Sequence, residues 1–186
     1  MLALLCAQRL RREPARDARL CTVHQVLRAQ ALPKGPGFSR HFRLLTLAEA
    51  GPARAEDGFE VGAVARHLAV FGRFLEALAA QGCTFPGRRA LLQVAAGSET
   101  LAARVEQALA RALPHVALAR ESFESRYYAG VRVLIGADAP SGEHLNLGDV
   151  GLFDWVAKLT SNRRLRFVAS GLGLHRAARQ FARRPA

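Results

Sequence analysis

Apolar residues recur along this chain of 186 residues at two spacings, and each spacing predicts one kind of element. From Phe59 to Gln81 they fall three and four positions apart, which predicts an amphipathic helix that ends at Gly82. A second helix is expected over residues 98–114, where the Ser98 hydroxyl can cap the first turn. The opening apolar stretch is too short for a signal sequence or a membrane span, so it indicates the end of a helix packed on the core.

Short apolar runs between turn signals predict strands. Residues 20–30 and 41–51 flank the segment "ALPKGPGFSR", whose prolines and glycines indicate a loop, so an antiparallel hairpin is expected. Periodicity alone leaves a helix open for residues 20–30. The other expected elements are strands at 89–97, 130–137 and 165–170, a loop at 121–124, a turn and then a helix within 145–164, and a last helix from about 172 to 184. This order predicts an α+β fold, a mostly antiparallel sheet with helices packed on one face.

Composition narrows the class of protein. A hydrophobic fraction of 50% and a charged fraction of 23% are typical of a folded globular chain, and the length favours one domain over residues 1–186. The formal net charge of +12 suggests a polyanionic partner. The arginines are spread along the chain rather than gathered in one block, so a solvated basic surface is the preferred interpretation, and phosphate contact at one site stays open.

Several kinds of site are disfavoured by the sequence. The cysteines Cys6, Cys21 and Cys83 form no C-x-x-C pair, which argues against a disulfide framework or a zinc knuckle and favours a reducing cytoplasm. The six histidines lack ligand spacing, so no metal site is expected. The phosphate-binding, dinucleotide-binding and nucleophile motifs of common enzymes are missing. The Gly-rich segment "GLGLHR" at 171–176 indicates tight packing of a strand against a helix or, alternatively, an anion site at exposed amides.

Basic residues on the hairpin and at the distant Gly-rich turn together suggest a phosphate clamp, because guanidinium groups match phosphate oxygens. The order of the segments resembles the catalytic core of class II aminoacyl-tRNA synthetases. It is most similar to the histidyl branch, which also contains the non-catalytic regulatory subunit of ATP phosphoribosyltransferase. The matching segments, which run along nearly the whole chain, are "VLRAQALPKGPGFSRHFRLLTLAEAG" for motif 2, "ALLQVAAGSETLAARVEQAL" for a strand and helix, "RYYAGVRVLIGA" for the histidine-binding segment, "GDVGLFDWVAKL" for G-G-R-Y-D-x-L, and "ASGLGLHRAA" for motif 3.

The resemblance implies two groups of ligand-binding residues. Arg28 falls on the motif 2 arginine that holds the α-phosphate of ATP, and Arg176 falls on the motif 3 arginine. Phe42 is similar to the ring that stacks on adenine, and the two tyrosines fall on the pair beside the amino-acid pocket. The implied nucleotide-binding residues are Arg28, Arg40, Phe42, Arg43 and Arg176, and the implied amino-acid-binding residues are Tyr127, Tyr128 and Gly130.

Other positions depart from the family pattern. Phe123 stands where the synthetases have an arginine that stabilises charge at the phosphate during amino-acid activation, and a phenylalanine cannot replace it. Gln30 and His175 stand where motifs 2 and 3 have glutamates. No catalytic residue is therefore expected. The chain also lacks segments similar to motif 1 and to the anticodon-binding domain, so we expect a truncated core that does not charge tRNA.

The leading expectation is a catalytically degenerate relative of the histidyl-tRNA synthetase core that acts as a regulatory or ligand-sensing subunit, as in histidine biosynthesis. Such a protein would have a catalytic partner subunit, would bind histidine or another amino acid, and would take ATP or AMP as a ligand rather than as a certain cofactor. The alternatives are an enzyme that forms aminoacyl-adenylates for a carrier other than tRNA, and a protein that binds tRNA or other RNA.

Overall fold

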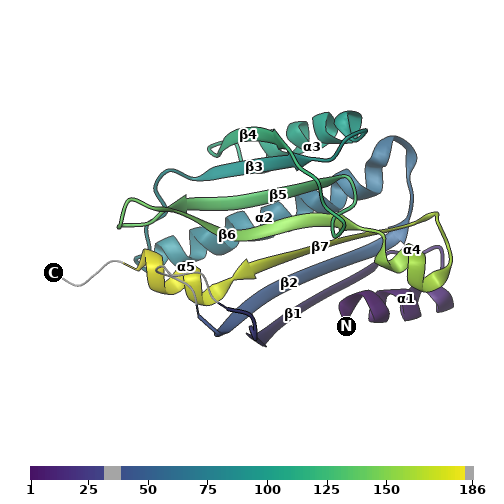
Figure 1. Cartoon of the computed structure of the whole chain (residues 1–186), viewed down its shortest axis with the longest axis horizontal. Coiled ribbons are helices and arrows are strands. Elements are labelled where there is room, and N and C mark those ends of the chain that lie inside the picture. The colour runs from purple at the N-terminus through teal and green to yellow at the C-terminus, as the bar shows by residue number, and fades with distance from the viewer. Residues whose placement is uncertain (32–38, 183–186) are drawn as a thin grey trace.

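The computed structural model describes residues 1–31 and 39–182, which contain a seven-stranded sheet and its flanking helices (Figure 1). The strands are β1 (Ala18–Leu27), β2 (His41–Pro52), β3 (Arg89–Val94), β4 (Ala117–Ser122), β5 (Val131–Asp138), β6 (His144–Phe153) and β7 (Leu165–Gly173). The helices are α1 (Leu2–Arg12), the 3-10 turn η1 (Ala55–Asp57), α2 (Gly58–Ala80), α3 (Glu99–Ala112), α4 (Trp155–Thr160) and α5 (Leu174–Phe181). No helix in the two described ranges is long and apolar enough to cross a membrane.

The strands lie in the order β1-β2-β7-β6-β5-β3-β4. All neighbours are antiparallel except β3 and β4, which are parallel and joined through α3. The predicted hairpin of β1 and β2 is confirmed, which excludes the helical alternative for its first strand. Most of the predicted loop of this hairpin, residues 32–38, lies outside the described residues, as do the last positions of the predicted final helix.

Helices pack on both faces of the sheet. Leu45 and Leu47 of β2 pack against a core that contains the buried side of α2, together with residues of α3 and α5. Ala48 and Ala50 of the same strand pack instead with Leu10 of α1. Neighbouring side chains of a strand point to opposite faces, so α1 and its partner α4 cover the other face at one end of the sheet. The prediction that the helices lie on one face is therefore correct for α2, α3 and α5 alone.

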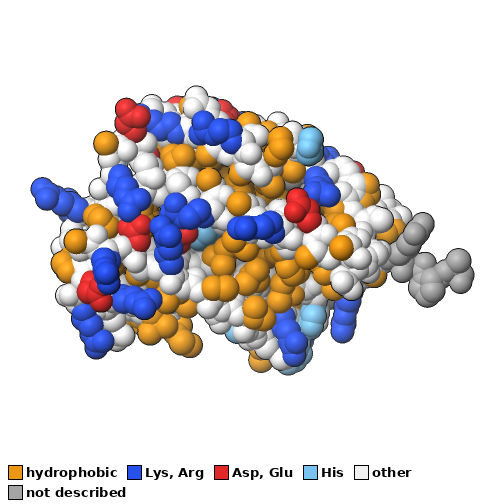
Figure 2. Space-filling view, turned by 180° about the vertical axis from the view of Figure 1, so that it is seen from behind, with side chains coloured by type: hydrophobic (Ala, Val, Ile, Leu, Met, Phe, Trp, Pro, Cys, Tyr) orange, Lys and Arg blue, Asp and Glu red, His pale blue; other side chains and the backbone are white. Residues whose placement is uncertain are grey.

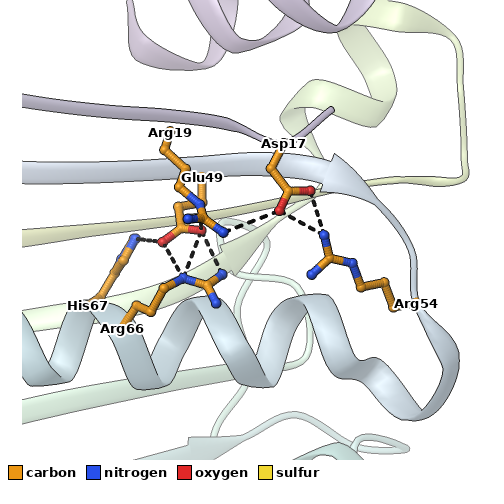
Figure 3. A network of polar contacts seen from close by, with 6 residues as sticks. All are labelled: Asp17, Arg19, Glu49, Arg54, Arg66 and His67. Atoms are coloured by element: carbon orange, nitrogen blue, oxygen red, sulfur yellow. Dashed lines mark hydrogen bonds and ion pairs between the residues drawn. The ribbon is translucent and has the colours of Figure 1, made fainter. Parts of the chain in front are cut away.

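A network of charged side chains fixes α2 to the β1–β2 hairpin (Figure 3). It is formed by Asp17, Arg19, Glu49, Arg54, Arg66 and His67. The buried Glu49 accepts hydrogen bonds from Arg66 Nε at 3.0 Å and Nη2 at 2.7 Å, and His67 Nε2 lies 3.5 Å from its Oε1. Burial alone would raise the pKa of Glu49, but the hydrogen bonds and charges of His67 and Arg66 outweigh it and lower this pKa to about 2.

The central strand β6 is the main error of the sequence-based prediction, which expected a turn at its position. Leu145, Leu147, Val150 and Leu152 give this segment an apolar pattern, but its glycines suggested a turn. One of those glycines serves close packing: a Cβ on Gly148 would lie 2.7 Å from a backbone oxygen of β7. A register shift between β5 and β6 further interrupts the alternation. The helix predicted after the turn is confirmed as α4.

Smaller differences lie at the edges of the predicted elements. Residues 121–122, expected in a loop, belong to β4, whose six residues are all exposed and so carry no apolar pattern. The final helix begins at Leu174 rather than near 172, because β7 continues to the preceding glycine. Ser98 precedes α3 as expected, but its side chain makes no capping hydrogen bond. Gly82 follows the end of α2 with a φ of 90°, which confirms the predicted stop.

Candidate functional site

A cavity of about 810 Å³ lies on the face of the sheet opposite α2, bordered by the β1–β2 hairpin and α5. Phe42 and Leu44 of β2 and Leu134 of β5 line it, since they alternate with residues that face α2. Gly171 and Gly173 of β7 also line the cavity, and the absence of side chains there leaves space above the sheet. Its volume is that of a pocket for a nucleotide-sized ligand.

Arginines dominate the charge of this cavity. Its lining contains Arg28, Arg132, Arg176 and Arg179, and Asp149 is the one carboxylate among the described lining residues. Burial lowers the pKa of Arg176, and the nearby charge of Arg28 lowers it further, while the carboxylate of Glu143 acts in the opposite direction. A bound anion would offset both effects on Arg176 and would meet a second guanidinium group in Arg28.

Secondary structure holds the two arginines and an aromatic ring in place. Arg28 lies just after β1, where its backbone N–H donates to the Arg40 carbonyl at 2.8 Å and extends the hairpin. Its guanidinium carbon lies 5.2 Å from the centroid of the Phe42 ring, a cation–π contact. Arg176 lies in the first turn of α5 and donates from Nη1 to the Asn146 carbonyl at 2.9 Å. Planar groups and fixed positive charge in one cavity suit a base that carries phosphates.

Asp149 of β6 connects the cavity to the neighbouring strands. Its Oδ2 accepts hydrogen bonds from the Tyr128 hydroxyl at 2.6 Å and from Arg132 Nε and Nη2 at 3.0 and 2.9 Å. Arg132 also donates from Nη1 to Gln93 Oε1 at 3.4 Å. Burial and the hydrogen bond to Asp149 raise the pKa of Tyr128, so its hydroxyl keeps the proton at neutral pH. The carboxylate is thus already paired, and positive charge remains in excess in the cavity.

The two tyrosines belong to an aromatic cluster beside the cavity. Tyr127 meets the rings of Tyr128, Phe153 and Trp155 edge-on, with centroids 5.0, 5.3 and 5.2 Å apart. The Tyr128 ring lies directly on Gly151 of β6, where a Cβ would collide with it. Because Gly151 has no side chain, the ring can approach the sheet and reach Asp149. The cluster is therefore linked to the cavity through the hydrogen bond from Tyr128 to Asp149.

The structure brings together three of the five residues predicted to bind a nucleotide. Arg28, Phe42 and Arg176 line one cavity although they are distant in the sequence. Arg40 and Arg43 do not line it within the described part of the chain. Arg43 follows Phe42 on β2, and neighbouring residues of a strand point to opposite faces, so its side chain is directed away from the cavity. Arg40 is exposed beside the end of the hairpin.

The residues predicted to bind an amino acid lie next to the cavity rather than among its lining residues. Tyr128 reaches it through Asp149, while Tyr127 is 57% exposed on the outer side of the aromatic cluster. Gly130 has a φ of 87°, and its carbonyl accepts a hydrogen bond from the Ala95 amide at 2.8 Å. That conformation favours glycine and gives the position a role in the backbone turn before β5. Their contact with an amino acid stays a prediction.

Sequence reasoning missed Arg132, Asp149 and Arg179 as cavity residues. Arg132 could have been found, because it is a charged residue between Val131 and Val133 in a predicted strand and must therefore face away from their core. Arg179 follows Arg176 by three positions and so shares its helix face. Asp149 was hidden by the interpretation of its strand as a turn. Across the described ranges, no group of three or more His, Cys, Asp and Glu could hold a metal ion.

Comparison with known proteins relates the fold to that of solved structures. No protein-family model matches the sequence, and no curated protein matches it. The apo histidyl-tRNA synthetase of S. aureus matches the structure with a TM-score of 0.66 and 11% identity, over 95% of this chain and 47% of that chain. An ATP phosphoribosyltransferase regulatory subunit/histidyl-tRNA synthetase from Bacillus halodurans matches with a TM-score of 0.60 and 13% identity, over 98% and 63%. The RNA-binding domain of threonyl-tRNA synthetase from Cryptosporidium parvum matches with a TM-score of 0.59 and 14% identity, over 95% of this chain and 46% of that chain.

These similarities establish the fold: the chain has the core fold of class II aminoacyl-tRNA synthetases, as the sequence predicted. At identities of 11% to 14% they establish no shared activity. The chain spans 46% to 63% of the length of these three structures.

Proposed function

We propose that this protein is a regulatory or ligand-sensing protein that binds an adenine nucleotide in the cavity and does not activate an amino acid. The observation that carries the proposal is the pair Arg28 and Arg176, which line the same cavity and whose positive charges repel each other there. A bound phosphate would offset that repulsion and would accept charge-assisted hydrogen bonds. With four lining arginines and one lining carboxylate that is already paired, the described part of the cavity favours anions over cations.

Aromatic contacts support a nucleotide over a simple anion. The Phe42 ring and the Arg28 guanidinium are both planar, and each can stack on a purine. The cavity is also larger than a phosphate ion needs. Histidine or another amino acid is the second ligand that we propose, placed beside Asp149 and the tyrosine pair.

Loss of catalysis is proposed from one position. Phe123, which matches the activation arginine of the synthetases, follows β4, and its ring lies 6.3 Å from that of Tyr128. A hydrocarbon ring there cannot stabilise charge that develops at a phosphate. The nucleotide would instead act by differential binding, favouring one conformation of a complex with a catalytic partner. One fold neighbour carries the name of such a regulatory subunit, which agrees with this proposal.

The test is isothermal titration of the purified chain with ATP, AMP, inorganic triphosphate and histidine at concentrations up to the millimolar range. We expect ATP or AMP to bind and inorganic triphosphate to bind more weakly, because it lacks a base. Absence of binding by both nucleotides would overturn the proposal. If triphosphate bound as tightly as ATP, a site for inorganic anions would replace the nucleotide site.

A second candidate is an enzyme that forms aminoacyl-adenylates for a carrier other than tRNA. It is favoured by Arg132, a guanidinium in the cavity that could take over the role of the missing activation arginine. Such an enzyme would catalyse amino-acid-dependent exchange of pyrophosphate into ATP. Exchange with any amino acid would favour this candidate, and its absence across all twenty would leave the regulatory protein.

A further inference from the structure

The two edges of the sheet differ in length and chemistry. β4, at one edge, has six residues and includes Arg120 and Glu121. A short edge strand with charged side chains is a poor template for pairing with another strand. β1, at the other edge, has ten residues and exposes Val23 by 58% and Leu27 by 65%. Within the described part of the chain no strand pairs with the outer side of β1. This edge therefore presents a long row of backbone N–H and C=O groups that can accept another strand.

An apolar surface continues from this edge toward α2, and we call it the β1 shelf. It consists of Cys21, Val23, Leu45 and Leu47. In the register of β1 and β2, Cys21 lies opposite Leu47 and Val23 opposite Leu45, and directly opposite residues share a face. The two leucines are half-buried against the α2 core, whereas Cys21 and Val23 stay exposed. Among the described residues, nothing covers the shelf, which is thus an extension of the core.

Side chains of α2 form the inner wall of the shelf. Arg66 binds Glu49 of β2 and so identifies the side of α2 that faces the hairpin. Val70 and Phe74 follow Arg66 by four and eight positions and lie on that same side. Figure 2 shows this face of the molecule, with a continuous patch of hydrophobic side chains in its lower centre and mostly basic side chains, together with some acidic ones, at the borders of the patch.

The charge around the shelf favours an acidic partner. Arg43 lies opposite Gln25 in the register and so shares the face of the shelf, and it is exposed. Arg73 is exposed on α2 seven positions after Arg66, on the same side of the helix. Of the nearby acids, Glu49 is buried and already bound by Arg66, and Glu76 is exposed on α2 three positions after Arg73. With a net charge of +12, two copies of this chain would repel each other at such a basic edge.

We propose that the β1 shelf binds an extended acidic segment of a partner protein, which pairs with β1 as an eighth strand. Backbone hydrogen bonds to the free edge would supply affinity, and every second side chain of the segment would lie on the shelf. Those side chains would be apolar, while acidic residues would reach Arg43 and Arg73. The shelf lies on the opposite face of the sheet from the cavity, so the inference stands whether or not a nucleotide binds there.

The test is selection of displayed random twelve-residue peptides on the immobilised full chain, followed by affinity measurements with the best synthetic peptide. We expect selected peptides to carry net negative charge and apolar residues at alternate positions. The same peptide with N-methyl groups on alternate amides should bind at least about tenfold more weakly if it pairs as a strand. Selection of peptides without acidic enrichment, or equal binding of the methylated peptide, would overturn the proposal.

Two matched variants locate the binding surface. Val23→Lys places a charge on the shelf and should weaken the peptide at least about tenfold. Leu118→Lys makes the same type of change on the other edge strand, where the side chain is 40% exposed, and should leave binding unchanged. Circular dichroism of both variants checks that they fold. If the peptide bound Val23→Lys as tightly as the wild type, the proposal would be overturned. It would also be overturned if the wild type sedimented as a dimer that Val23→Lys dissociates, because the shelf would then bind a second copy of this chain.

Discussion

The Tyr128 hydroxyl donates a hydrogen bond of 2.6 Å to Oδ2 of Asp149, an oxygen that also accepts two hydrogen bonds from Arg132. The Tyr128 ring in turn packs against Phe153, which lies 4.2 Å from Trp155, centroid to centroid. The aromatic cluster is therefore in direct contact with a charged residue of the cavity. Because Trp155 is the one tryptophan of the chain, its fluorescence can report on changes at Asp149.

Removal of the Arg28 or the Arg176 side chain should weaken nucleotide binding. Arg28→Ala and Arg176→Ala should each lower the affinity for ATP about tenfold or more, because a charge-assisted hydrogen bond contributes about 1.5 to 3 kcal/mol. Titration calorimetry measures the change. Arg43→Ala is the matched control, since that side chain points to the opposite face of the sheet. An equal loss in the control would mean that general basic charge, rather than the cavity, attracts the ligand.

Asp149→Asn should have opposite effects on binding and on stability. The change removes the carboxylate from the described cavity lining, so phosphate ligands should bind several-fold more tightly at low salt. It also leaves Arg132 and the Tyr128 hydroxyl with a weaker acceptor, which should cost about 1 to 3 kcal/mol of unfolding free energy. Titration and urea unfolding measure the two quantities, and Tyr128→Phe should show the stability loss without the gain in affinity. Weaker ligand binding in Asp149→Asn would show that the carboxylate itself contacts the ligand.

Gly151→Ala should disturb the aromatic cluster, because the new Cβ would collide with the Tyr128 ring. We expect a loss of about 1 to 3 kcal/mol in unfolding free energy and a shift in Trp155 fluorescence, as the ring is displaced. Gly171→Ala is the control for stability and fluorescence, since its Cβ would have no neighbour nearer than 3.9 Å. Identical fluorescence spectra of Gly151→Ala and the wild type would show that displacement of the Tyr128 ring does not reach Trp155.

The buried Glu49 should make stability depend on acid pH. Its folded pKa of about 2 lies below the ordinary value of 4.5, so its contribution is present above pH 4.5 and is lost as pH falls toward 2. Glu49→Gln should therefore be less stable than the wild type by about 3 kcal/mol at pH 7, and the difference should shrink as the pH is lowered. Urea unfolding between pH 7 and pH 2 measures this. Glu106→Gln, at an ion pair of 3.8 Å on the surface, should follow the wild-type profile.

The three cysteines should react in the order of their exposure. Cys21 is exposed, whereas Cys6 and Cys83 are buried. Burial raises the pKa of Cys6 to about 11, against the opposing charge of Arg9, so at pH 8 its thiol stays protonated and shielded. Iodoacetamide followed by peptide mass spectrometry should find label on Cys21 in the native protein and on all three in denaturant. Rapid native labelling of Cys6 would contradict the packing of α1 on the sheet.

The parts of the fold that sequence predicts correctly have local signals. The helix pattern of α2 lies within one continuous segment, and the turn residues that predict the β1–β2 hairpin lie between its two strands. Arg28 and Arg176 could be predicted as candidate phosphate-binding residues because the resemblance depends on the order of segments, which survives low identity, and both residues line the cavity. Their meeting in one cavity still required the pairing of β2 with β7, a contact that no local pattern shows.

The parts that sequence missed depend on neighbours elsewhere in the chain. Gly148 and Gly151 look like turn residues, yet one allows close approach of β7 and the other makes room for Tyr128. β4 has no buried residue and is a strand because β3 offers it a parallel partner. Asp149 lines the cavity because its strand, β6, lies between β5 and β7 in the sheet. Each of these facts concerns pairing, which hydrophobic spacing does not encode.

The pairing of β2 with β7 also sets the time at which the chain can fold on the ribosome. β2 ends at Pro52 but receives its second neighbour from residues 165–173, so more than a hundred residues must be synthesised before that side of the hairpin is covered. Contacts of such long sequence separation slow folding and leave strand edges exposed in the meantime. The nascent hairpin, with its apolar side chains, is therefore the segment for which a chaperone would be most useful during translation.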